Sequence, residues 1–247
     1  MDDLFSASTR ERSFMNAPLA VRMRPNSLDE YVGQQKAVGK GSWLRAAIEH
    51  DVLSSVILYG PAGTGKTTLA HIIANHTKSE FVEVSAVTGT VKDLRRVIDE
   101  AKTRLNTYDR RTILFIDEIH RFNKGQQDYL LPFVEDGTVT LIGATTENPY
   151  FEVNGALISR SIIFELKPLE KEDIKTLLHR ALEDMEKGMG AYRAVADEEA
   201  LEFLADVSNG DARSALNAIE LGILTTERSA DGLIHITLDV ASECIQK

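Results

Sequence analysis

Short apolar runs alternate with amphipathic segments from Ser55 onward. The runs are rich in β-branched and aromatic residues and predict five strands, at residues 55–59, 80–85, 112–117, 138–144 and 161–166. The intervening segments have helical spacing, which places helices near residues 66–77, 90–105, 126–135 and 154–160. Strands that alternate with helices are typical of an α/β fold with a parallel sheet, right-handed crossovers and a ligand at the carboxyl ends of the strands.

The pattern changes after Pro168, where helical spacing continues without further strands. It predicts helices at residues 169–187, 197–208 and 211–226 and the start of another at Thr237. We therefore expect an α/β core at 17–167 and a small all-helical domain at 168–247, which ends where a further C-terminal region would begin. Residues 1–16 are polar and lack periodicity, which predicts a disordered segment.

A glycine-rich motif follows the first predicted strand and opens the first predicted helix. It fits the pattern G-x-x-x-x-G-K-[ST] and reads Gly60-Pro61-Ala62-Gly63-Thr64-Gly65-Lys66-Thr67. Glycines let the backbone wrap around a triphosphate, and the helix N-terminus adds the backbone N–H groups of residues such as Thr68. In this motif Lys66 reaches the β- and γ-phosphates and the Thr67 hydroxyl ligates Mg²⁺. A chance match is the alternative, but the strand before the motif and the helix after it favour ATP or GTP binding.

Two adjacent acids, Asp117 and Glu118, follow the continuous apolar run that predicts the third strand. Acids at the end of a buried strand are costly unless they serve a purpose. In a P-loop ATPase the first, Asp117, orients the Mg²⁺ shell and the second, Glu118, polarises the attacking water. Taken alone, an Asp-Glu pair after a strand is equally consistent with an ordinary loop that has no catalytic role. Together with the P-loop, the pair predicts hydrolysis of the nucleotide as well as binding.

Composition limits the class of protein further. The chain has 247 residues, 43% of them hydrophobic, and none of its apolar runs approaches the ~18 residues that a membrane helix needs. The acidic start Met1-Asp2-Asp3 is unlike a signal peptide, so we expect a soluble intracellular protein. The single cysteine, Cys244, excludes an internal disulfide and a Cys-cluster zinc site, and the six histidines have no metal-ligand spacing.

The net charge of −10 is distributed unevenly. Residues 1–166 carry 19 Lys and Arg against 21 Asp and Glu, a charge of −2, whereas residues 167–247 carry 9 against 17, a charge of −8. Any DNA contact therefore belongs to the first part, where residues 91–111 hold seven basic residues against four acids. The alternative is a solvated helix face whose charges are paired along the helix.

Two further motifs complete a recognisable set: Ile142-Gly143-Ala144-Thr145-Thr146 at the end of the fourth strand and Ser159-Arg160-Ser161 before the fifth. With the P-loop and the Asp-Glu pair, they resemble an AAA+ ATPase, which has an α/β core and a helical lid. The resemblance implies that Thr146 is sensor 1, which hydrogen-bonds the γ-phosphate or the attacking water. It makes Arg160 an arginine finger offered to a neighbouring subunit, and Arg213 sensor 2, which closes the lid on the nucleotide.

Three longer segments resemble the RarA/MgsA family, whose eukaryotic member is the Werner helicase-interacting protein. They are the runs Arg24 to Gln34, Asp117 to Lys124 and Gly143 to Pro149. Clamp-loader subunits and the RuvB branch-migration motor share the general motifs but not the run His120 to Lys124. In this resemblance the first segment packs around the adenine, with Tyr31 and Val32 as base contacts, although plain core packing is an alternative.

The resemblance also implies a biological setting. It predicts a Mg²⁺-dependent, DNA-stimulated ATPase in DNA replication, recombination and repair, in the bacterial cytoplasm at the nucleoid. The partners implied are stalled forks, DNA ends or single-strand gaps, and replication proteins such as single-strand-binding protein or a helicase. A homo-oligomer is expected for the full-length protein, and no membrane. Phe122 and Lys124 are candidate DNA contacts, with a buried Phe and an exposed Lys as the alternative.

Two departures from the family pattern matter. Ser85 stands where members usually carry Asn, a position from which the catalytic Glu can be restrained, so DNA control of hydrolysis is in question. The family also continues into a C-terminal oligomerisation domain of comparable length that this chain lacks, so we expect either a fragment or a different mode of assembly. Two other functions stay open: a clamp-loader-type or branch-migration ATPase, and a nucleotide-dependent interaction module with little turnover.

Overall fold

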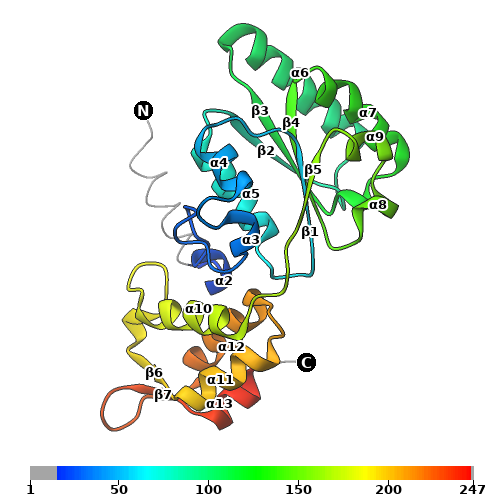
Figure 1. The fold of residues 1–247 in the computed structure, drawn as a ribbon. Helices are drawn as coiled ribbons and strands as arrows, with labels where there is room; N and C mark the ends of the chain where they lie inside the picture. The colour runs from blue at the N-terminus through cyan, green and yellow to red at the C-terminus, as the bar shows by residue number, and fades with distance from the viewer. Residues whose placement is uncertain (1–15, 246–247) are drawn as a thin grey trace. The chain divides into compact units, whose positions relative to one another are not determined.

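A computed structural model describes residues 16–245 and divides them into two compact units (Figure 1). The core unit runs from Pro25 to Lys167. The helical unit joins the chain from Pro168 onward to the segment that ends at Arg24. The predicted core boundary at Ala17 is therefore wrong by several residues. The predicted disordered segment 1–16 lies outside the described residues, except for Asn16.

The core unit is built on a parallel sheet of strand order β2-β3-β4-β1-β5. In chain order the strands are β1 (Val56–Tyr59), β2 (Glu80–Ser85), β3 (Thr112–Asp117), β4 (Val139–Thr145) and β5 (Ile162–Glu165). The predicted α/β class with five parallel strands is confirmed. The register pairs Tyr59 with Thr145 and Ser85 with Asp117, so the carboxyl ends of β1 to β4 share one edge of the sheet.

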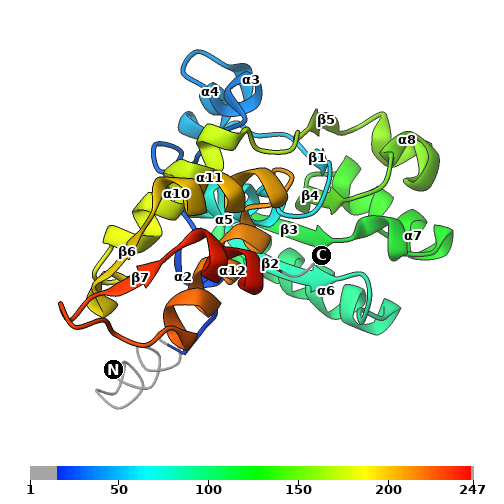
Figure 2. The ribbon, with the colours of Figure 1, turned by 90° about the horizontal axis from the view of Figure 1, so that it is seen from below.

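Helices cover both faces of this sheet, which explains why its strands are continuous apolar runs (Figure 2). One apolar cluster joins Leu58 and Phe115 to α5 (Lys66–His76) and α4 (Trp43–Glu49). The other joins Ile57 and Leu114, from the opposite face, to three further helices. These are α6 (Val91–Tyr108), α7 (Lys124–Glu135) and α9 (Gly155–Ile158). Each central strand is thus buried from both sides.

Three short helices precede the sheet and were not predicted: α2 (Leu19–Arg22), α3 (Gln35–Val38) and α4. Each is seven residues or shorter, too short to establish a helical period in the sequence. α2 belongs to the helical unit, where the Leu19 N–H donates to Glu220 Oε2 at 2.9 Å and Arg22 pairs with Glu220 at 3.3 Å. This anchoring explains why the core begins at Pro25.

The helical unit contains the helices that the sequence predicts. They are α10 (Lys171–Glu183), α11 (Glu198–Val207), α12 (Ala212–Thr225) and α13 (Leu238–Cys244). The expectation that no strand follows Pro168 is wrong, because β6 (Ala194–Ala196) and β7 (Ile234–Ile236) pair in parallel. Three residues are too few to reveal a period of two. Among residues 16–245, no helix is long and apolar enough to cross a membrane.

Candidate functional site

The glycine-rich loop lies between β1 and α5, and its glycines are structural necessities. Gly60, Gly63 and Gly65 have φ values of 150°, 70° and 95°, a region that residues with a side chain rarely adopt. A Cβ on Gly60 would lie 2.0 Å from the Leu166 carbonyl oxygen, and one on Gly65 would lie 2.4 Å from the Tyr31 hydroxyl. The loop therefore takes this close-packed form only with glycine at these positions.

Lys66 begins α5 and folds back over this loop. Its side chain is buried, and Nζ donates to the carbonyl oxygens of Gly60 at 2.6 Å and Pro61 at 2.7 Å. The first turn of a helix leaves backbone N–H groups without acceptors inside the helix, and here they belong to Lys66, Thr67 and Thr68. A cationic ammonium beside a turn of donors is a set that suits a polyphosphate, so the loop fits the nucleotide predicted for it.

Tyr31 supports the loop from within the core. Its ring is only 8% exposed and packs in the cluster that includes α4 and α5, and its hydroxyl lies 3.3 Å from Thr64 O and 3.2 Å from Gly65 O. Burial raises the pKa of this phenol, so it stays a donor. These contacts favour core packing, the alternative to the predicted base contact. Val32, which is partly exposed, remains a predicted base contact.

Both predicted acids lie at the edge of the sheet that carries the P-loop. Asp117 ends β3, and its carbonyl accepts the Ala86 N–H at 3.0 Å, whereas Glu118 turns out of the strand with φ 53°. The Gly60 N–H donates to the Thr145 carbonyl at 3.1 Å, which fixes the start of the P-loop beside the end of β4. The topology thus brings the P-loop, the acids and Thr146 to one edge.

The carboxylate of Glu118 is held by two neighbours. Thr146 Oγ1 donates to Glu118 Oε2 at 3.4 Å, and His120 Nδ1 lies 3.2 Å from the same oxygen. His120 Nδ1 is also 2.8 Å from Thr145 Oγ1. The sequence singles out His120 only as part of the run His120 to Lys124. Its contact with Glu118 depends on the left-handed turn at Glu118, which no periodicity reveals.

An apolar contact fixes this turn to the sheet. The short 3₁₀ helix η1 (Ile119–Arg121) follows Glu118, and Ile119 is fully buried. Ile119 packs on Gly143 of β4, where a Cβ would lie 3.2 Å from Ile119 Cδ1. The Ile119 side chain would therefore have to shift by a few tenths of an ångström to admit a residue larger than glycine at this point.

Arg160 lies at the opposite edge of the sheet. It follows α9 and precedes β5, whose first residue, Ile162, pairs with Val56 at the start of β1. Its guanidinium pairs with Glu135 at 2.5 Å and donates to Ala156 O at 3.2 Å. The structure therefore separates Arg160 from the P-loop of its own chain by the length of the strands.

Arg213, the predicted sensor 2, belongs to the helical unit. It is exposed in the first turn of α12, where its N–H donates to the N-cap side chain of Asp211 at 2.8 Å. Its closure on the nucleotide stays a prediction. Phe122 is 3% exposed and lies in the core, so the buried alternative holds and it is no DNA contact, whereas Lys124 is exposed.

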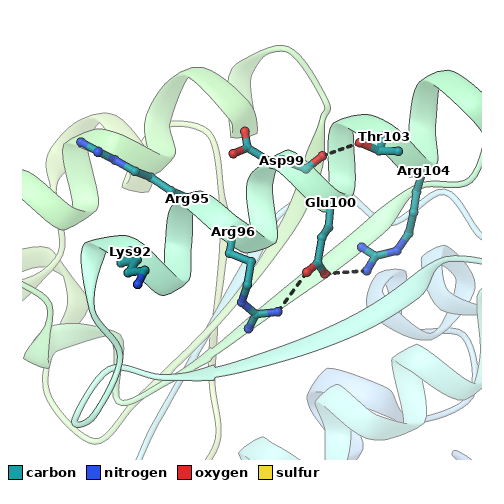
Figure 3. Close-up of a pocket in the computed structure, with 7 residues that line it drawn as sticks. All are labelled: Lys92, Arg95, Arg96, Asp99, Glu100, Thr103 and Arg104. Atoms are coloured by element: carbon teal, nitrogen blue, oxygen red, sulfur yellow. Dashed lines mark hydrogen bonds and ion pairs between the residues drawn. The ribbon is translucent and has the colours of Figure 1, made fainter.

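Most of the basic segment 91–111 forms α6 (Val91–Tyr108), and a surface hollow on this helix is lined by seven residues (Figure 3). They are Lys92, Arg95, Arg96, Asp99, Glu100, Thr103 and Arg104. Arg96 and Arg104 both pair with Glu100, each at 3.0 Å. The Arg95 guanidinium lies 5.9 Å from the centre of the Tyr129 ring. Two of the arginines are thus paired within the helix, whereas Lys92 and Arg95 extend the positive face.

Protein ligands for a divalent cation are few at this site. Across residues 16–245 no group of three or more His, Cys, Asp or Glu side chains is arranged to hold a metal ion. Mg²⁺ in nucleotide sites takes one or two protein ligands together with phosphate oxygens and water. One hydroxyl from Thr67 and one carboxylate from Asp117 match that requirement, so the donor set fits Mg²⁺ held jointly with a nucleotide.

A parallel sheet of this order, with a phosphate-binding loop after β1 and a helical unit after β5, defines a P-loop nucleotide-binding protein of the AAA+ class. Residues 23–154 match the family described as the Holliday junction DNA helicase RuvB P-loop domain. Residues 190–247 match the AAA C-terminal domain. A solved structure of the Thermotoga maritima RuvB Holliday junction branch migration motor is similar, with a TM-score of 0.70 and 31% identity over 90% of this chain and 72% of that one.

Curated relatives define the family more narrowly. Replication-associated recombination protein A of Bacillus subtilis is 48% identical over 93% of this chain and 53% of its own length. The Escherichia coli K12 protein of that name is 52% identical over 83% of this chain and 45% of its own length. ATPase WRNIP1 of Dictyostelium discoideum is 45% identical over 89% of this chain and 24% of its own length. The chain belongs to this replication-associated recombination protein A family of AAA+ ATPases, as its motifs predict, and spans about half the length of the bacterial relatives.

Proposed function

We propose that this chain binds ATP with Mg²⁺ and hydrolyses it. The observation that carries the proposal is that the Glu118 carboxylate is held at the edge of the sheet that also carries the P-loop and the buried ammonium of Lys66. A carboxylate fixed in this way can accept the proton of an attacking water.

Each residue at this edge has a separate task. Lys66 exchanges its loop carbonyls for phosphate oxygens, and the N–H groups at the start of α5 bind the same anion. Thr67 and Asp117 hold Mg²⁺, which neutralises charge on the phosphates when it is bound. Thr146 keeps Glu118 in position and serves as sensor 1 for the γ-phosphate. Adenine selectivity rests on family membership, with Val32 as the base contact.

Arg160 acts in trans in this proposal. Its place at the amino edge of the sheet excludes it from the P-loop of its own chain, and a planar cationic fork suits the charge on transferring phosphoryl oxygens. Arg213 acts in cis, from the first turn of α12. Complete sites therefore require at least two subunits.

The biological role rests on the relatives. Since these carry replication-associated recombination in their names, we propose that ATP turnover here drives remodelling of DNA or protein at stalled forks, ends or gaps, at the bacterial nucleoid. Single-strand-binding protein and replicative helicases are the partners expected. The second candidate is a branch-migration or clamp-loading ATPase, which the similarity to the RuvB motor favours.

One titration separates these functions. ATPase rate is measured against protein concentration, with and without Mg²⁺ and with duplex, gapped, forked or four-way-junction DNA. We expect turnover that needs Mg²⁺ and rises with concentration and with gapped or forked DNA. Preferential stimulation by four-way junctions would favour branch migration, stimulation by a sliding clamp would favour clamp loading, and tight ATP binding without turnover under all conditions would overturn hydrolysis.

A further inference from the structure

His120 lies beside the Glu118 carboxylate, at the edge of the sheet that carries the P-loop. It sits in η1, between the buried residues Ile119 and Phe122. Backbone hydrogen bonds close the turn on either side, from Arg121 N to Glu118 O at 2.8 Å and from Phe122 N to Ile119 O at 3.1 Å. The imidazole is 10% exposed, so its ring is held in one orientation by the surrounding structure.

The contacts of His120 determine which atom carries its proton. Nδ1 lies 2.8 Å from Thr145 Oγ1 and 3.2 Å from Glu118 Oε2. The Thr145 hydroxyl donates to the Glu147 carbonyl at 3.4 Å and accepts the Glu147 N–H at 3.0 Å. Since the Glu118 carboxylate can only accept, a proton on Nδ1 serves it, and Nδ1 faces the hydroxyl oxygen and the carboxylate together.

Both contacts on the catalytic carboxylate fall on one oxygen. His120 Nδ1 lies 3.2 Å from Oε2 of Glu118, and the Thr146 hydroxyl donates to the same oxygen at 3.4 Å. A carboxylate oxygen with two such neighbours is a weaker base than its partner, so Oε1 is the better acceptor for a water proton. We propose that His120 is a positioning residue, which fixes the Glu118 carboxylate so that Oε1 faces the attacking water. This inference rests on the proposed role of Glu118.

Ser85, at the end of β2, has a local partner instead. Its hydroxyl accepts the Val87 N–H at 3.3 Å and so closes its own turn. The Ser85 carbonyl accepts the Gly89 N–H at 2.7 Å in the same turn. The groups that hold Glu118 thus come from η1 and from the end of β4.

Two substitutions of similar polarity provide the test. The amide N–H of His120→Asn lies near the position of Nδ1, whereas that of His120→Gln reaches toward the position of Nε2. We expect His120→Gln and His120→Leu to lower kcat about tenfold, within the range of general-base effects. KM for ATP should change less than about twofold, and His120→Asn should retain most of the turnover. His50→Leu, at an exposed histidine that ends α4, is the control.

Each outcome bears on the inference. Equal kcat for His120→Asn and His120→Gln, or a kcat for His120→Gln at or above wild type, would overturn it. The comparison of Asn with Gln stands even where His120→Leu fails to fold. Glu118→Gln separates the two proposals. Full turnover in Glu118→Gln would exclude Glu118 as the base. Loss of turnover in Glu118→Gln together with normal turnover in His120→Gln would exclude only the role of His120. In the Glu118→Gln background, His120→Gln should cause no further loss.

Discussion

Arg160 forms an ion pair with Glu135 of its own chain, with 2.5 Å between Nη2 and Oε1, at the edge of the sheet opposite the P-loop. Both side chains are partly exposed, and exposed ion pairs contribute little to folding stability, about 0 to 1 kcal/mol. The pair is therefore weak enough to open, as the role in trans proposed for Arg160 requires. Glu135 occupies the guanidinium in this structure.

Arg160→Ala should leave ATP affinity nearly unchanged and lower turnover by about an order of magnitude or more, because charge on the transferring phosphoryl group loses its fork. Turnover is measured on the variant alone and in mixtures with Lys66→Ala. In mixtures of full-length chains the intact finger of Lys66→Ala should restore activity. No recovery, or turnover per subunit that is independent of concentration, would return Arg160 to a structural role.

Lys66→Ala should abolish ATP binding, because it removes the ammonium that balances the phosphate charge at the mouth of the loop. Calorimetric titration with ATP and Mg²⁺ measures the loss. Lys36→Ala, at an exposed lysine of α3, is the matched control and should bind normally. Near wild-type affinity in Lys66→Ala would contradict the assignment of the P-loop.

Glu118→Gln should bind ATP as tightly as wild type and hydrolyse it at least about a hundredfold more slowly, because an amide cannot take a proton from water. Binding is followed by titration and turnover by phosphate release. A rate within a few-fold of wild type would exclude Glu118 as the base. The hydrogen bond from Thr146 would then hold a residue without a catalytic role.

Arg95→Gln combined with Arg96→Gln should reduce the slope of log affinity for DNA against log salt by about two, since each arginine removed frees about one phosphate of its cation. Fluorescence anisotropy at several salt concentrations gives the slope. Lys36→Gln with Lys40→Gln removes the same charge elsewhere and should leave the slope unchanged. An unchanged slope in the arginine variant would identify α6 as a solvated face with paired charges, such as the ion pair of Arg96 with Glu100.

Tyr31→Phe should lower the free energy of unfolding by about 1 kcal/mol, since two carbonyl oxygens of the P-loop lose their donor. Chemical denaturation measures this change. Tyr108→Phe, at a ring that is 72% exposed, should have no effect. If Tyr31 instead contacts the adenine through its hydroxyl, stability will hold and ATP affinity alone will fall.

Sequence patterns predicted the parts of the fold that depend on burial. β3 is buried along its length and was predicted at the bounds that the structure has, because a strand covered on both faces is apolar at nearly every position. The short helices α2 to α4 and the strand β7 escaped prediction because a period needs more residues than they contain. Tyr31 shows another limit. The resemblance predicts it as a base contact, but its ring is buried by packing that only the folded chain specifies.

The candidate site divides in the same way. Lys66, Asp117 and Glu118 were identified because the P-loop and the acid pair occupy contiguous sequence next to strong strands. His120 and Glu135 were not identified from the sequence. A left-handed turn brings His120 to Glu118, and a tertiary contact brings Glu135 to Arg160, and no sequence pattern reveals either.

The contact between Ile119 and Gly143 has a consequence for how the polar site is built. Glu118, which is proposed to activate water, precedes Ile119, and the Ile119 side chain packs on Gly143 of β4. The position of this carboxylate thus depends on packing inside the sheet as well as on the polar groups around it. A change of one methyl group in that core can leave the protein folded and still displace the Glu118 carboxylate. Residues inside the sheet therefore affect both the stability of the fold and the proposed chemistry.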